Sequence, residues 1–359
     1  YQVKDNILIS TGGSGGHVVP AQTLHEHLKD DFNVFLTSDL RGSKFFENDY
    51  KNLKIINVLP LTQNIFVLPW RIVIFFLSIL KSFTYLKRKR IKTIISTGGY
   101  MSLPICISAK ILKRKVILFE PNFVLGRSNL FFLNYCSSIL CYSEEIRNFP
   151  IKFKKKIRLI SPLLRKSVYL EKKNKNNFKK KIRILIIGGS QGADYFQKNL
   201  KDTILKLSDK VELEIIQQTN DKNRENLKNF YERNQIKYEL FNFKKNLFKT
   251  THEINFCITR AGASSLAELV QINLPFVAIP FPYAKDNHQY YNALFYKKLN
   301  CCWMIEQNPN IANDLFNLIY SFFENKNDLN EKIDAMKKIT YENSWNNINQ
   351  KIIDSINEN

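Results

Sequence analysis

Apolar residues along the chain gather in short runs rich in β-branched side chains. Each run leads into a turn and then into a longer segment of helical character. The short runs are typical of buried strands, and the longer segments predict the helices that connect them. Strands that alternate with helices in this way build a parallel sheet. The pattern therefore predicts an α/β fold.

The same pattern begins twice along the chain. One strand and glycine loop reads NILISTGGSGGH from Asn6, and a second reads IRILIIGGSQGA from Ile182. We therefore predict two doubly wound, Rossmann-like domains. The predicted boundaries are an N-terminal domain at 1–165, a polar Lys/Asn-rich linker at 166–181, a C-terminal domain at 182–335 and a single C-terminal helix at 336–359.

Composition and charge narrow the class of protein. The 359 residues include 54 Lys and Arg against 32 Asp and Glu, a formal net charge of +22. This excess indicates an anionic partner such as lipid headgroups, nucleic acid or a phosphorylated substrate, although biased residue usage explains it equally well. The six cysteines form no CxxC pair, so we expect them to be reduced and structural. The first residues do not resemble a secretory leader, which favours a cytoplasmic location.

Residues 65–86, IFVLPWRIVIFFLSILKSFTYL, are apolar over most of a helical surface, and the basic run KRKR follows at 87–90. We expect a helix whose apolar face enters a membrane surface while the basic run meets anionic headgroups. A buried crossover helix is the main alternative, and a transmembrane span is disfavoured because the stretch is short and interrupted. The polar strip of this helix consists of Arg71, Ser78, Lys81, Ser82 and Tyr85.

The first glycine loop, GGSGG at 12–16, separates a strand from a helix expected to begin near Pro20. Glycines let backbone N–H groups approach an anion at a helix N-terminus, so the loop is expected to face a phosphate. Its spacing is not GxGxxG, and no acidic residue clearly ends the following strand, which disfavours a nicotinamide enzyme. His17 directly follows the loop and is a candidate base; an ordinary surface or core histidine is the alternative. The turn STGGY at 96–100 either lines the same crevice or is purely structural.

The second half of the chain offers a similar set of groups. In the loop GGSQG, Ser190 adds a hydroxyl that could bond a phosphate oxygen. The segment TRAGASSLAE leads from a strand into a helix bearing Glu268, whose carboxylate could accept both hydroxyls of a ribose; an ordinary solvated residue is the alternative. The polar segment PYAKDNHQYYN at 282–292 and Asn122 suit sugar hydroxyls, with plain loops as the alternative.

Taken in order, these segments resemble the MurG family, the N-acetylglucosaminyltransferases that convert undecaprenyl-diphospho-muramoyl-pentapeptide into the disaccharide lipid precursor of peptidoglycan. The resemblance runs nearly from end to end and rests on GGSGGHVVPA, STGGYMSLP, EPNFVLGRSN, GGSQGA, RAGASSLAE and DNHQYYNA. It implies a GT-B fold, with the donor UDP-N-acetylglucosamine mainly on the second domain, the undecaprenyl-linked acceptor on the first, and catalysis in the cleft. It also implies a peripheral enzyme at the anionic cytoplasmic face of a bacterial inner membrane, without a nucleic-acid partner.

The resemblance also implies roles for individual residues. Substrate contacts at the first loop would be Ser14, Gly15 and Gly16. The donor sugar would meet Asn122 and Gln289, and the donor phosphate would meet Ser190. The nucleoside would be held by Ala263, Ser264, Ser265, Leu266, Ala267 and Glu268, with Glu268 on the ribose.

Three positions depart from the family pattern. Lys244 stands where the family usually has an apolar residue whose backbone meets the uracil, so only its backbone is expected there. FEPN replaces the usual His-Glu-Gln-Asn, so that Phe119 and Pro121 remove an imidazole and an amide near the cleft. The segment SPLLR is one residue longer than the usual Asn-Pro-Val-Arg turn, which makes Arg165 a less secure phosphate ligand.

The resemblance implies an inverting displacement, in which the muramoyl 4-hydroxyl attacks the anomeric carbon of the donor and UDP leaves. We assign His17 as the general base, and the glycine-loop N–H groups as stabilisers of the leaving diphosphate. No acidic pair has metal-ligand spacing, so neither a metal nor another cofactor is expected. Two other functions stay open: a UDP-sugar-dependent glycolipid synthase acting on diacylglycerol, and a non-catalytic basic protein that binds membranes or nucleic acid.

Overall fold

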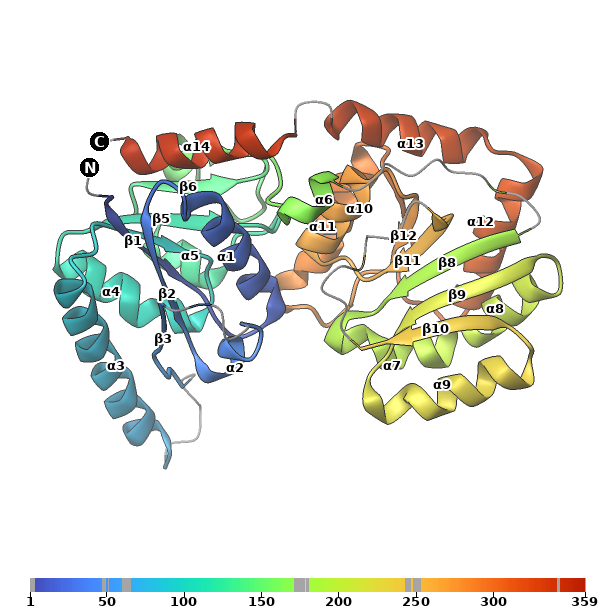
Figure 1. Ribbon diagram of the computed structural model, residues 1–359, viewed down its shortest axis with the longest axis horizontal. Helices are drawn as coiled ribbons and strands as arrows, with labels where there is room; N and C mark the ends of the chain where they lie inside the picture. The colour runs from blue at the N-terminus through green and yellow to red at the C-terminus, as the bar shows by residue number, and fades with distance from the viewer. Residues whose placement is uncertain are drawn as a thin grey trace. The chain divides into compact units, whose positions relative to one another are not determined.

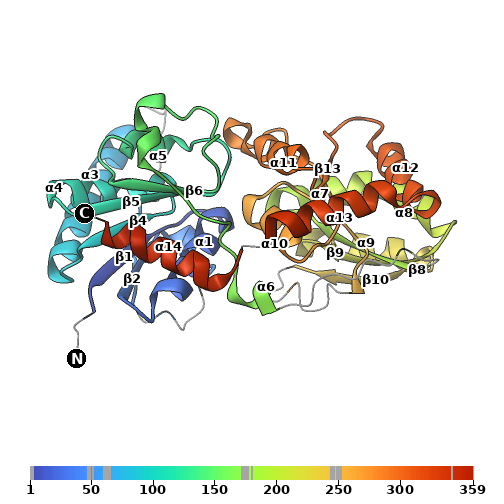
Figure 2. The same ribbon diagram turned by 90° about the horizontal axis from the view of Figure 1, so that it is seen from above.

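The computed structural model describes residues 4–46, 50, 52–59, 66–170, 178, 181–242, 247, 253–340 and 343–358, with backbone only at 190–193. The chain divides into two compact units: unit 1 comprises residues 1–164 and 344–359, and unit 2 comprises residues 165–343. Figures 1 and 2 show the elements of each unit from two directions. Each unit is a parallel sheet covered by helices, as the sequence predicts.

Unit 1 is built on a seven-stranded parallel sheet in the order β3-β2-β1-β4-β5-β6-β7. Its strands are β1 (Asn6–Ser10), β2 (Asn33–Ser38), β3 (Leu53–Ile55), β4 (Thr93–Ser96), β5 (Lys115–Glu120), β6 (Ser138–Cys141) and β7 (Ile157–Leu159). Its α-helices are α1 (Gly15–Leu28), α2 (Leu40–Ser43), α3 (Leu68–Arg88), α4 (Leu103–Ile111), α5 (Arg127–Phe132) and α14 (Trp345–Asn357). The strand order reverses between β1 and β4, so the loops GGSGG and STGGY leave the sheet side by side.

Unit 2 repeats this plan with a six-stranded parallel sheet in the order β10-β9-β8-β11-β12-β13. Its strands are β8 (Lys181–Ile187), β9 (Glu212–Gln218), β10 (Lys237–Phe241), β11 (Phe256–Thr259), β12 (Phe276–Ala278) and β13 (Trp303–Met304). Its α-helices are α6 (Lys166–Leu170), α7 (Gly189–Asn199), α8 (Lys201–Ser208), α9 (Asp221–Arg233), α10 (Ala263–Gln271), α11 (His288–Lys298), α12 (Ile311–Glu324) and α13 (Asn327–Thr340). The order reverses between β8 and β11, which brings the loops GGSQG and RAG together.

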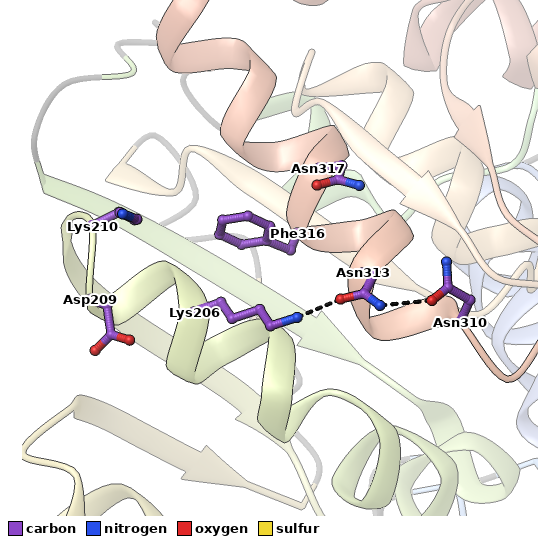
Figure 3. A pocket seen from close by; sticks show the side chains of 7 residues that line it. All are labelled: Lys206, Asp209, Lys210, Asn310, Asn313, Phe316 and Asn317. Atoms are coloured by element: carbon purple, nitrogen blue, oxygen red, sulfur yellow. Dashed lines mark hydrogen bonds between the residues drawn. The ribbon is translucent and has the colours of Figure 1, made fainter.

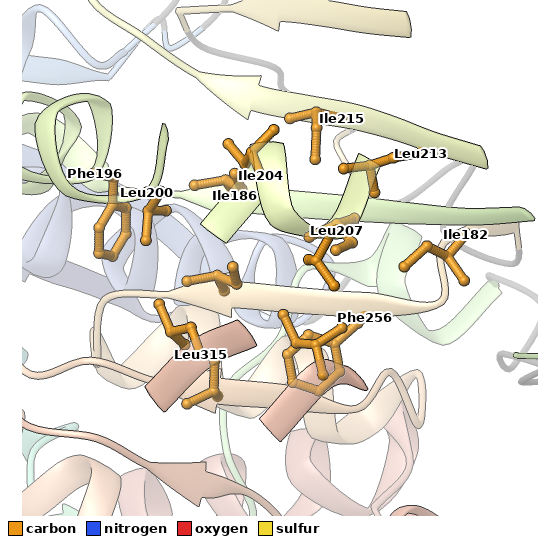
Figure 4. Packing of buried hydrophobic residues seen from close by; sticks show 14 of the residues in the cluster. Ile182, Ile186, Phe196, Leu200, Ile204, Leu207, Leu213, Ile215, Phe256 and Leu315 are labelled. Carbon is orange, nitrogen blue, oxygen red and sulfur yellow. The ribbon is translucent and has the colours of Figure 1, made fainter. Parts of the chain in front are cut away.

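The core of unit 2 lies between the sheet and the helices α7, α8 and α12 (Figure 4). Ile186 on β8 and Ile215 on β9 are fully buried, and helix residues such as Phe196 and Leu315 pack in the same cluster. Each such side chain contributes about 1.5–3 kcal/mol when it leaves water. The short apolar runs of the sequence are therefore the strands that this core requires, and they fix where the glycine loops emerge.

Helix α3 presents its apolar residues to the outside of unit 1. Trp70, Phe76 and Leu80 are 64%, 61% and 63% exposed. The helix has 21 residues and is largely apolar, so by length and composition alone it could cross a membrane. Its exposure shows that the buried crossover helix considered from the sequence is wrong. Ile65, the first residue of the predicted segment, lies outside the described residues.

The inner face of α3 combines two small polar residues with Leu86, which is fully buried, and with Phe75 and Tyr85, which pack on the core of unit 1. Ser78 and Ser82 are buried, and Ser78 Oγ donates to Asn57 O at 2.9 Å. On the adjoining helix α4, Ser108 Oγ donates to Ile79 O at 2.9 Å. The two serines of the predicted polar strip therefore face unit 1, whereas Trp70, Phe76 and Leu80 lie on the outside.

The C-terminal segment forms two helices instead of the single predicted one. Helix α13 ends at Thr340, and α14 begins at Trp345 after Ser344, whose Oγ accepts a hydrogen bond from Asn347 N at 3.3 Å. A serine in this position starts a new helix because it satisfies one of the first backbone N–H groups. Helix α14 then belongs to unit 1, whereas α13 belongs to unit 2.

Helix α14 packs against α1 within unit 1. The Trp345 ring stacks on the His27 ring with centroids 3.5 Å apart and planes 12° from parallel. Ile348 and Ile352 are fully buried, which agrees with the apolar stripe seen in the sequence, whereas Ile339 lies half-exposed on α13. The helix that follows the first glycine loop is therefore covered by the last helix of the chain.

Candidate functional site

The first glycine loop follows β1 and lies against the segment after β2. Gly12 has φ +154° and Gly13 has φ +78°. A Cβ atom on Gly12 would lie 2.6 Å from Asp39 Oδ1 and 2.6 Å from Met101 Cγ. The loop can take this path only with glycine, because a side chain has no room and the backbone of Gly13 is left-handed.

Helix α1 begins at Gly15 and not near Pro20 as predicted. The N–H groups of His17 and Val18 both bond to Ser14 O, at 3.1 and 3.2 Å, so the helix starts within the loop and Pro20 lies inside it. The first backbone N–H groups of a helix have no acceptor within it and attract anions. The predicted contacts Ser14, Gly15 and Gly16 are the cap and the first two residues of α1.

Asp39 organises this loop and was missed by the sequence argument. Its Oδ1 accepts from Gly13 N and from Gly42 N, both at 2.8 Å, and its Oδ2 accepts from Arg41 Nε at 3.2 Å. The expectation that no acidic residue ends the strand after the loop is therefore wrong, because Asp39 directly follows β2. This carboxylate is only 2% exposed and is occupied by the backbone, so it shapes the loop rather than presenting itself to a ribose.

His17 and the turn STGGY come together in unit 1. The Nδ1 atom of His17 lies 2.8 Å from Thr97 O. A carbonyl only accepts hydrogen bonds, so Nδ1 carries the proton and the lone pair of the neutral ring is on Nε2. Cβ atoms built on Gly98 and Gly99 would lie 3.6 Å from His17 Cε1 and 3.5 Å from Nε2. The ring edge that can accept a proton therefore faces these two glycines.

We expect Gly99→Ala to impair both stability and turnover. Gly99 has φ +86°, and an added Cβ would lie 2.6 Å from Met101 Sδ, so the turn against His17 must shift. The strain should cost about 1–3 kcal/mol, measured as the free energy of unfolding. Gly189→Ala is the control for stability alone, because Gly189 also has a positive φ (+61°) but no atom of the described residues lies within 4 Å of its Cβ position. Equal losses in the two variants would contradict a role for the space beside His17.

Asn122 is held by a buried carboxylate. Glu120, the last residue of β5, is 3% exposed, and its Oε1 accepts from the backbone N and the side-chain Nδ2 of Asn122 at 3.2 and 3.1 Å. Its Oε2 accepts from Gly126 N at 2.8 Å and from Asn129 Nδ2 at 2.9 Å. Burial raises the pKa of the Glu120 carboxyl, and these donors oppose that shift. The turn that carries Asn122 is therefore built around Glu120.

The described residues offer neither a group of metal ligands nor an exposed cysteine. Among the residues with described positions, no three His, Cys, Asp or Glu side chains are grouped so that they could hold a metal ion. All six cysteines are buried and free, as predicted. Burial raises the pKa of the Cys106 thiol to about 12, which keeps it protonated and unreactive at neutral pH.

The second glycine loop connects β8 to α7. Gly188 caps the helix and Gly189 follows with φ +61°, while Gly189 N donates to Gln218 Oε1 at 2.9 Å. Gln218, at the end of β9, holds this loop much as Asp39 holds the first one. The predicted phosphate contact Ser190 lies in the first turn of α7, but its side chain is outside the described residues, and so is all of Lys244.

Helix α10 carries the residues predicted to hold the nucleoside. Ala263, Ser264 and Ser265 form its partly buried first turn, after the cap at Gly262. Leu266 and Ala267 are buried, so their side chains belong to the core of unit 2 and only their backbone could meet a ligand.

Glu268 is not a solvated helix residue. It is 5% exposed, and its two carboxylate oxygens accept from Arg165, Oε1 from Nε at 2.9 Å and Oε2 from Nη2 at 3.0 Å. The residue expected to bind a phosphate therefore lies against the residue expected to bind a ribose. No spacing rule links these positions, since 103 residues separate them along the chain.

Gln289 and Asn292 hold the turn before α10 from two sides. Gln289 Oε1 accepts from Ala261 N at 3.2 Å and from Phe281 N at 3.0 Å. One helical turn later, the buried Asn292 donates from Nδ2 to Ala261 O at 3.1 Å. Because the oxygen of Gln289 is engaged by two backbone donors, its Nε2 is the group that could donate to a sugar hydroxyl.

Arg260 is a further residue that the sequence argument did not single out. It is buried, its Nη1 donates to Ile279 O at 3.0 Å and to Pro280 O at 3.1 Å, and its guanidinium lies over the Tyr195 ring at 4.9 Å. Burial lowers its pKa to about 10, so it stays charged at neutral pH. The arginine fixes the strand end after β12 beside the RAG turn. Its place in RAGASS, before two small residues, was the signal available in the sequence.

A separate hollow lies between α8 and α12 in unit 2 (Figure 3). It has a volume of about 580 Å³, and Lys206 on its wall donates a hydrogen bond to Asn313 Oδ1. None of the predicted substrate contacts lines it. Its lining residues are Lys206, Asp209, Lys210, Asn310, Asn313, Phe316 and Asn317.

Comparison with known proteins identifies the class of enzyme to which this chain belongs. The profile of the glycosyltransferase family 28 N-terminal domain matches residues 7–141, and that of the family 28 C-terminal domain matches residues 183–347. A crystal structure of Acinetobacter baumannii MurG has a TM-score of 0.75 at 20% identity over 98% of this chain and 99% of that one. Anabaena HepE in complex with UDP has a TM-score of 0.66 at 11% identity, over 98% and 99%. The protein is a glycosyltransferase with the GT-B fold.

Curated relatives narrow this class to one family. A Pelagibacter ubique protein named UDP-N-acetylglucosamine--N-acetylmuramyl-(pentapeptide) pyrophosphoryl-undecaprenol N-acetylglucosamine transferase is 50% identical over 99% of this chain and 100% of its own length. A Rickettsia felis protein of the same name is 33% identical over 89% and 91%. The chain belongs to the MurG family, as the ordered motifs of the sequence predict.

Proposed function

We propose that the protein transfers N-acetylglucosamine from UDP-N-acetylglucosamine to the muramoyl 4-hydroxyl of an undecaprenyl-linked muramoyl-pentapeptide. The observation that carries this proposal is the 50% identity, over 99% of the chain, to a curated transferase with that donor and acceptor in its name. The loops described above agree with it, because each unit places a glycine loop and a helix N-terminus at its switch point, where phosphorylated ligands bind.

In the proposed reaction, His17 takes the proton from the attacking hydroxyl. The hydrogen bond of His17 Nδ1 to Thr97 O leaves Nε2 as the basic nitrogen. The hydroxyl oxygen forms a bond to the anomeric carbon, the bond from that carbon to the diphosphate breaks, and UDP leaves with inversion at that carbon. Backbone N–H groups at the glycine loops stabilise the charge that develops on the diphosphate, with Ser190 as a further donor.

Donor binding in this proposal rests mainly on unit 2. The first turn of α10, from Ala263 to Ser265, meets the nucleoside, and Glu268 accepts from the ribose hydroxyls. Gln289 Nε2 donates to a sugar hydroxyl, since its oxygen is engaged by the backbone. The backbone of Lys244 meets the uracil. Asn122, which Glu120 fixes, is a further proposed contact for the donor sugar.

The experiment that tests the proposal uses labelled UDP-N-acetylglucosamine with two acceptors offered separately. One is undecaprenyl-diphospho-muramoyl-pentapeptide in vesicles, and the other is diacylglycerol in vesicles of the same lipid. Label is expected only in the first product, with release of one UDP per sugar transferred. Labelling of diacylglycerol alone would replace the proposal with a glycolipid synthase.

We further propose that α3 docks unit 1 on the anionic cytoplasmic face of the inner membrane. Trp70, Phe76 and Leu80 project outward from this helix, and the basic residues 87–90 follow at its end. Apolar side chains that enter the interface and cations that meet phospholipid headgroups act together in such helices.

The triple variant Trp70→Ser, Phe76→Ser, Leu80→Ser is expected to bind anionic vesicles about 100-fold more weakly, because each side chain loses at least about 1 kcal/mol of apolar burial. Co-sedimentation with vesicles measures this. Leu170→Ser, which removes another highly exposed apolar side chain but from unit 2, is the control and should leave binding unchanged. Equal sedimentation of the triple variant and the wild type would refute docking through α3.

A further inference from the structure

Both places where the chain passes between its two units adjoin helix α10. The chain leaves unit 1 between Leu164 and Arg165 and returns to it between Asn343 and Ser344. Arg165 bonds to Glu268 on α10. Asn343 Nδ2 donates to Gln271 Oε1, one turn further along the same helix, at 3.1 Å. The first and the last described residues of unit 2 are thus tied to the helix that carries the proposed ribose contact.

The Arg165–Glu268 pair is bidentate and largely shielded from water. The guanidinium reaches the two oxygens through Nε and Nη2, and the side chains are 25% and 7% exposed. A fork of this kind fixes the plane of the carboxylate as well as its position. An ionised carboxylate has about four lone-pair sites, of which the arginine uses two. The remaining sites, one on each oxygen, match the two neighbouring hydroxyls of a ribose.

Gln271, the last residue of α10, is fixed in a similar way. Tyr169, on the short helix α6 that follows Arg165, donates from its hydroxyl to Asn343 Oδ1 at 3.2 Å. Asn343 in turn donates from Nδ2 to Gln271 Oε1. Helix α6 packs on α10 between these two contacts. Arg165 is therefore held by a braced segment and does not swing freely on a loop.

We propose that Arg165 is a positioning residue: it orients Glu268 for both ribose hydroxyls and thereby selects ribonucleotides, without itself contacting the diphosphate. This inference rests on the proposed use of a uridine diphosphate donor. It differs from the phosphate contact expected from the family resemblance, because the Nε–Nη2 edge of the guanidinium is directed at Glu268. The two roles predict different losses when the arginine is changed.

The test compares binding of UDP, 2′-deoxy-UDP and uridine to the full-length protein by calorimetry or by competition. Arg165→Lys keeps the positive charge but cannot form the fork. Arg183→Lys is the matched control, because Arg183 forms a comparable half-buried pair with Glu214 at 2.8 Å, near the amino end of β8 and away from the loops. Thermal unfolding of each variant shows whether the fold is kept.

Arg165→Lys is expected to weaken the binding of UDP and of uridine by the same factor, about tenfold. It should reduce the preference for UDP over 2′-deoxy-UDP by a similar factor. Arg183→Lys should leave the affinities for all three ligands unchanged. A loss confined to UDP, with uridine binding kept, would show a phosphate contact and overturn the proposal. An unchanged preference for the ribose would overturn it as well.

Because Arg165→Lys could lower stability by leaving Glu268 poorly paired, a second pair of variants keeps the test decisive. Glu268→Gln should itself remove the ribose preference, and Arg165→Met added to Glu268→Gln should then cause no further loss. A further loss in the double variant would show that Arg165 acts on the ligand directly. If the wild type bound no UDP at all, the proposed function would fail together with this inference. If the wild type bound UDP and Arg165→Lys kept the full preference for UDP over 2′-deoxy-UDP, only this inference would fail.

Discussion

Replacing His17 with alanine is expected to lower kcat by about 10²–10⁴-fold at saturating donor and acceptor, the usual contribution of a general base. The KM for the donor should change little, because the proposed nucleoside contacts lie in unit 2. Steady-state rates measured with the donor and the acceptor varied in turn check both points.

His25→Ala is the matched control, since His25 lies on the same helix but away from the glycine loop. Burial lowers the pKa of His25, so this histidine is neutral at physiological pH. Loss of the His17–Thr97 hydrogen bond should cost about 1 kcal/mol of stability, so the His17 variant is expected to remain folded. Turnover near the wild-type rate in a folded His17→Ala protein would remove His17 as the base.

The second large effect is expected from Gln289→Glu, with kcat/KM about 100-fold lower. The glutamate keeps an oxygen for the N–H groups of Ala261 and Phe281 but loses the Nε2 donor proposed for the sugar hydroxyl. It also adds a negative charge near the anionic donor. Together these changes correspond to about 2–3 kcal/mol. The melting temperature should stay close to that of the wild type, because the backbone contacts persist.

Asn292→Asp provides the opposite case on the same helix. Here the side chain donates to Ala261 O from a buried position, so the acid would place an oxygen against a carbonyl oxygen. We expect a loss of about 1–3 kcal/mol in the free energy of unfolding, with a much smaller direct effect on ligand contacts. Thermal unfolding and kcat/KM measured on both variants separate the two roles. A strongly destabilised Gln289→Glu protein would contradict the assigned orientation of that amide.

The fold could be predicted from the sequence because it depends on patterns among residues that are close along the chain. Short apolar runs and glycine loops identify the strands and the point where each sheet changes direction, and the restart at Ile182 reveals the second sheet. The C-terminal segment shows the limit of such signals. Its apolar stripe is continuous enough to suggest one helix, yet Ser344 starts a new one, and the two halves pack against different units.

The contacts that shape the candidate site were harder to predict from the sequence, because they join distant parts of the chain. The sequence suggested Glu268 as a ribose contact, but its burial depends on Arg165, which is far away along the chain. Asp39 was overlooked because an aspartate after a strand is common, and its role appears only when the backbone of Gly13 reaches it. Likewise the exposure of α3 depends on which face its serines turn toward. Side-chain partners of this kind follow from tertiary packing and not from periodicity.

The position of α14 has a consequence for how the protein is made. The ribosome produces most of unit 1 first, then all of unit 2, and only afterwards residues 344–358, which complete unit 1. At about 5–20 residues per second, synthesis of residues 165–343 takes on the order of 10–40 s. During that interval the His27 side of α1 lacks its Trp345 cover, and the helix that bears His17 is enclosed only after residues 344–358 have been made.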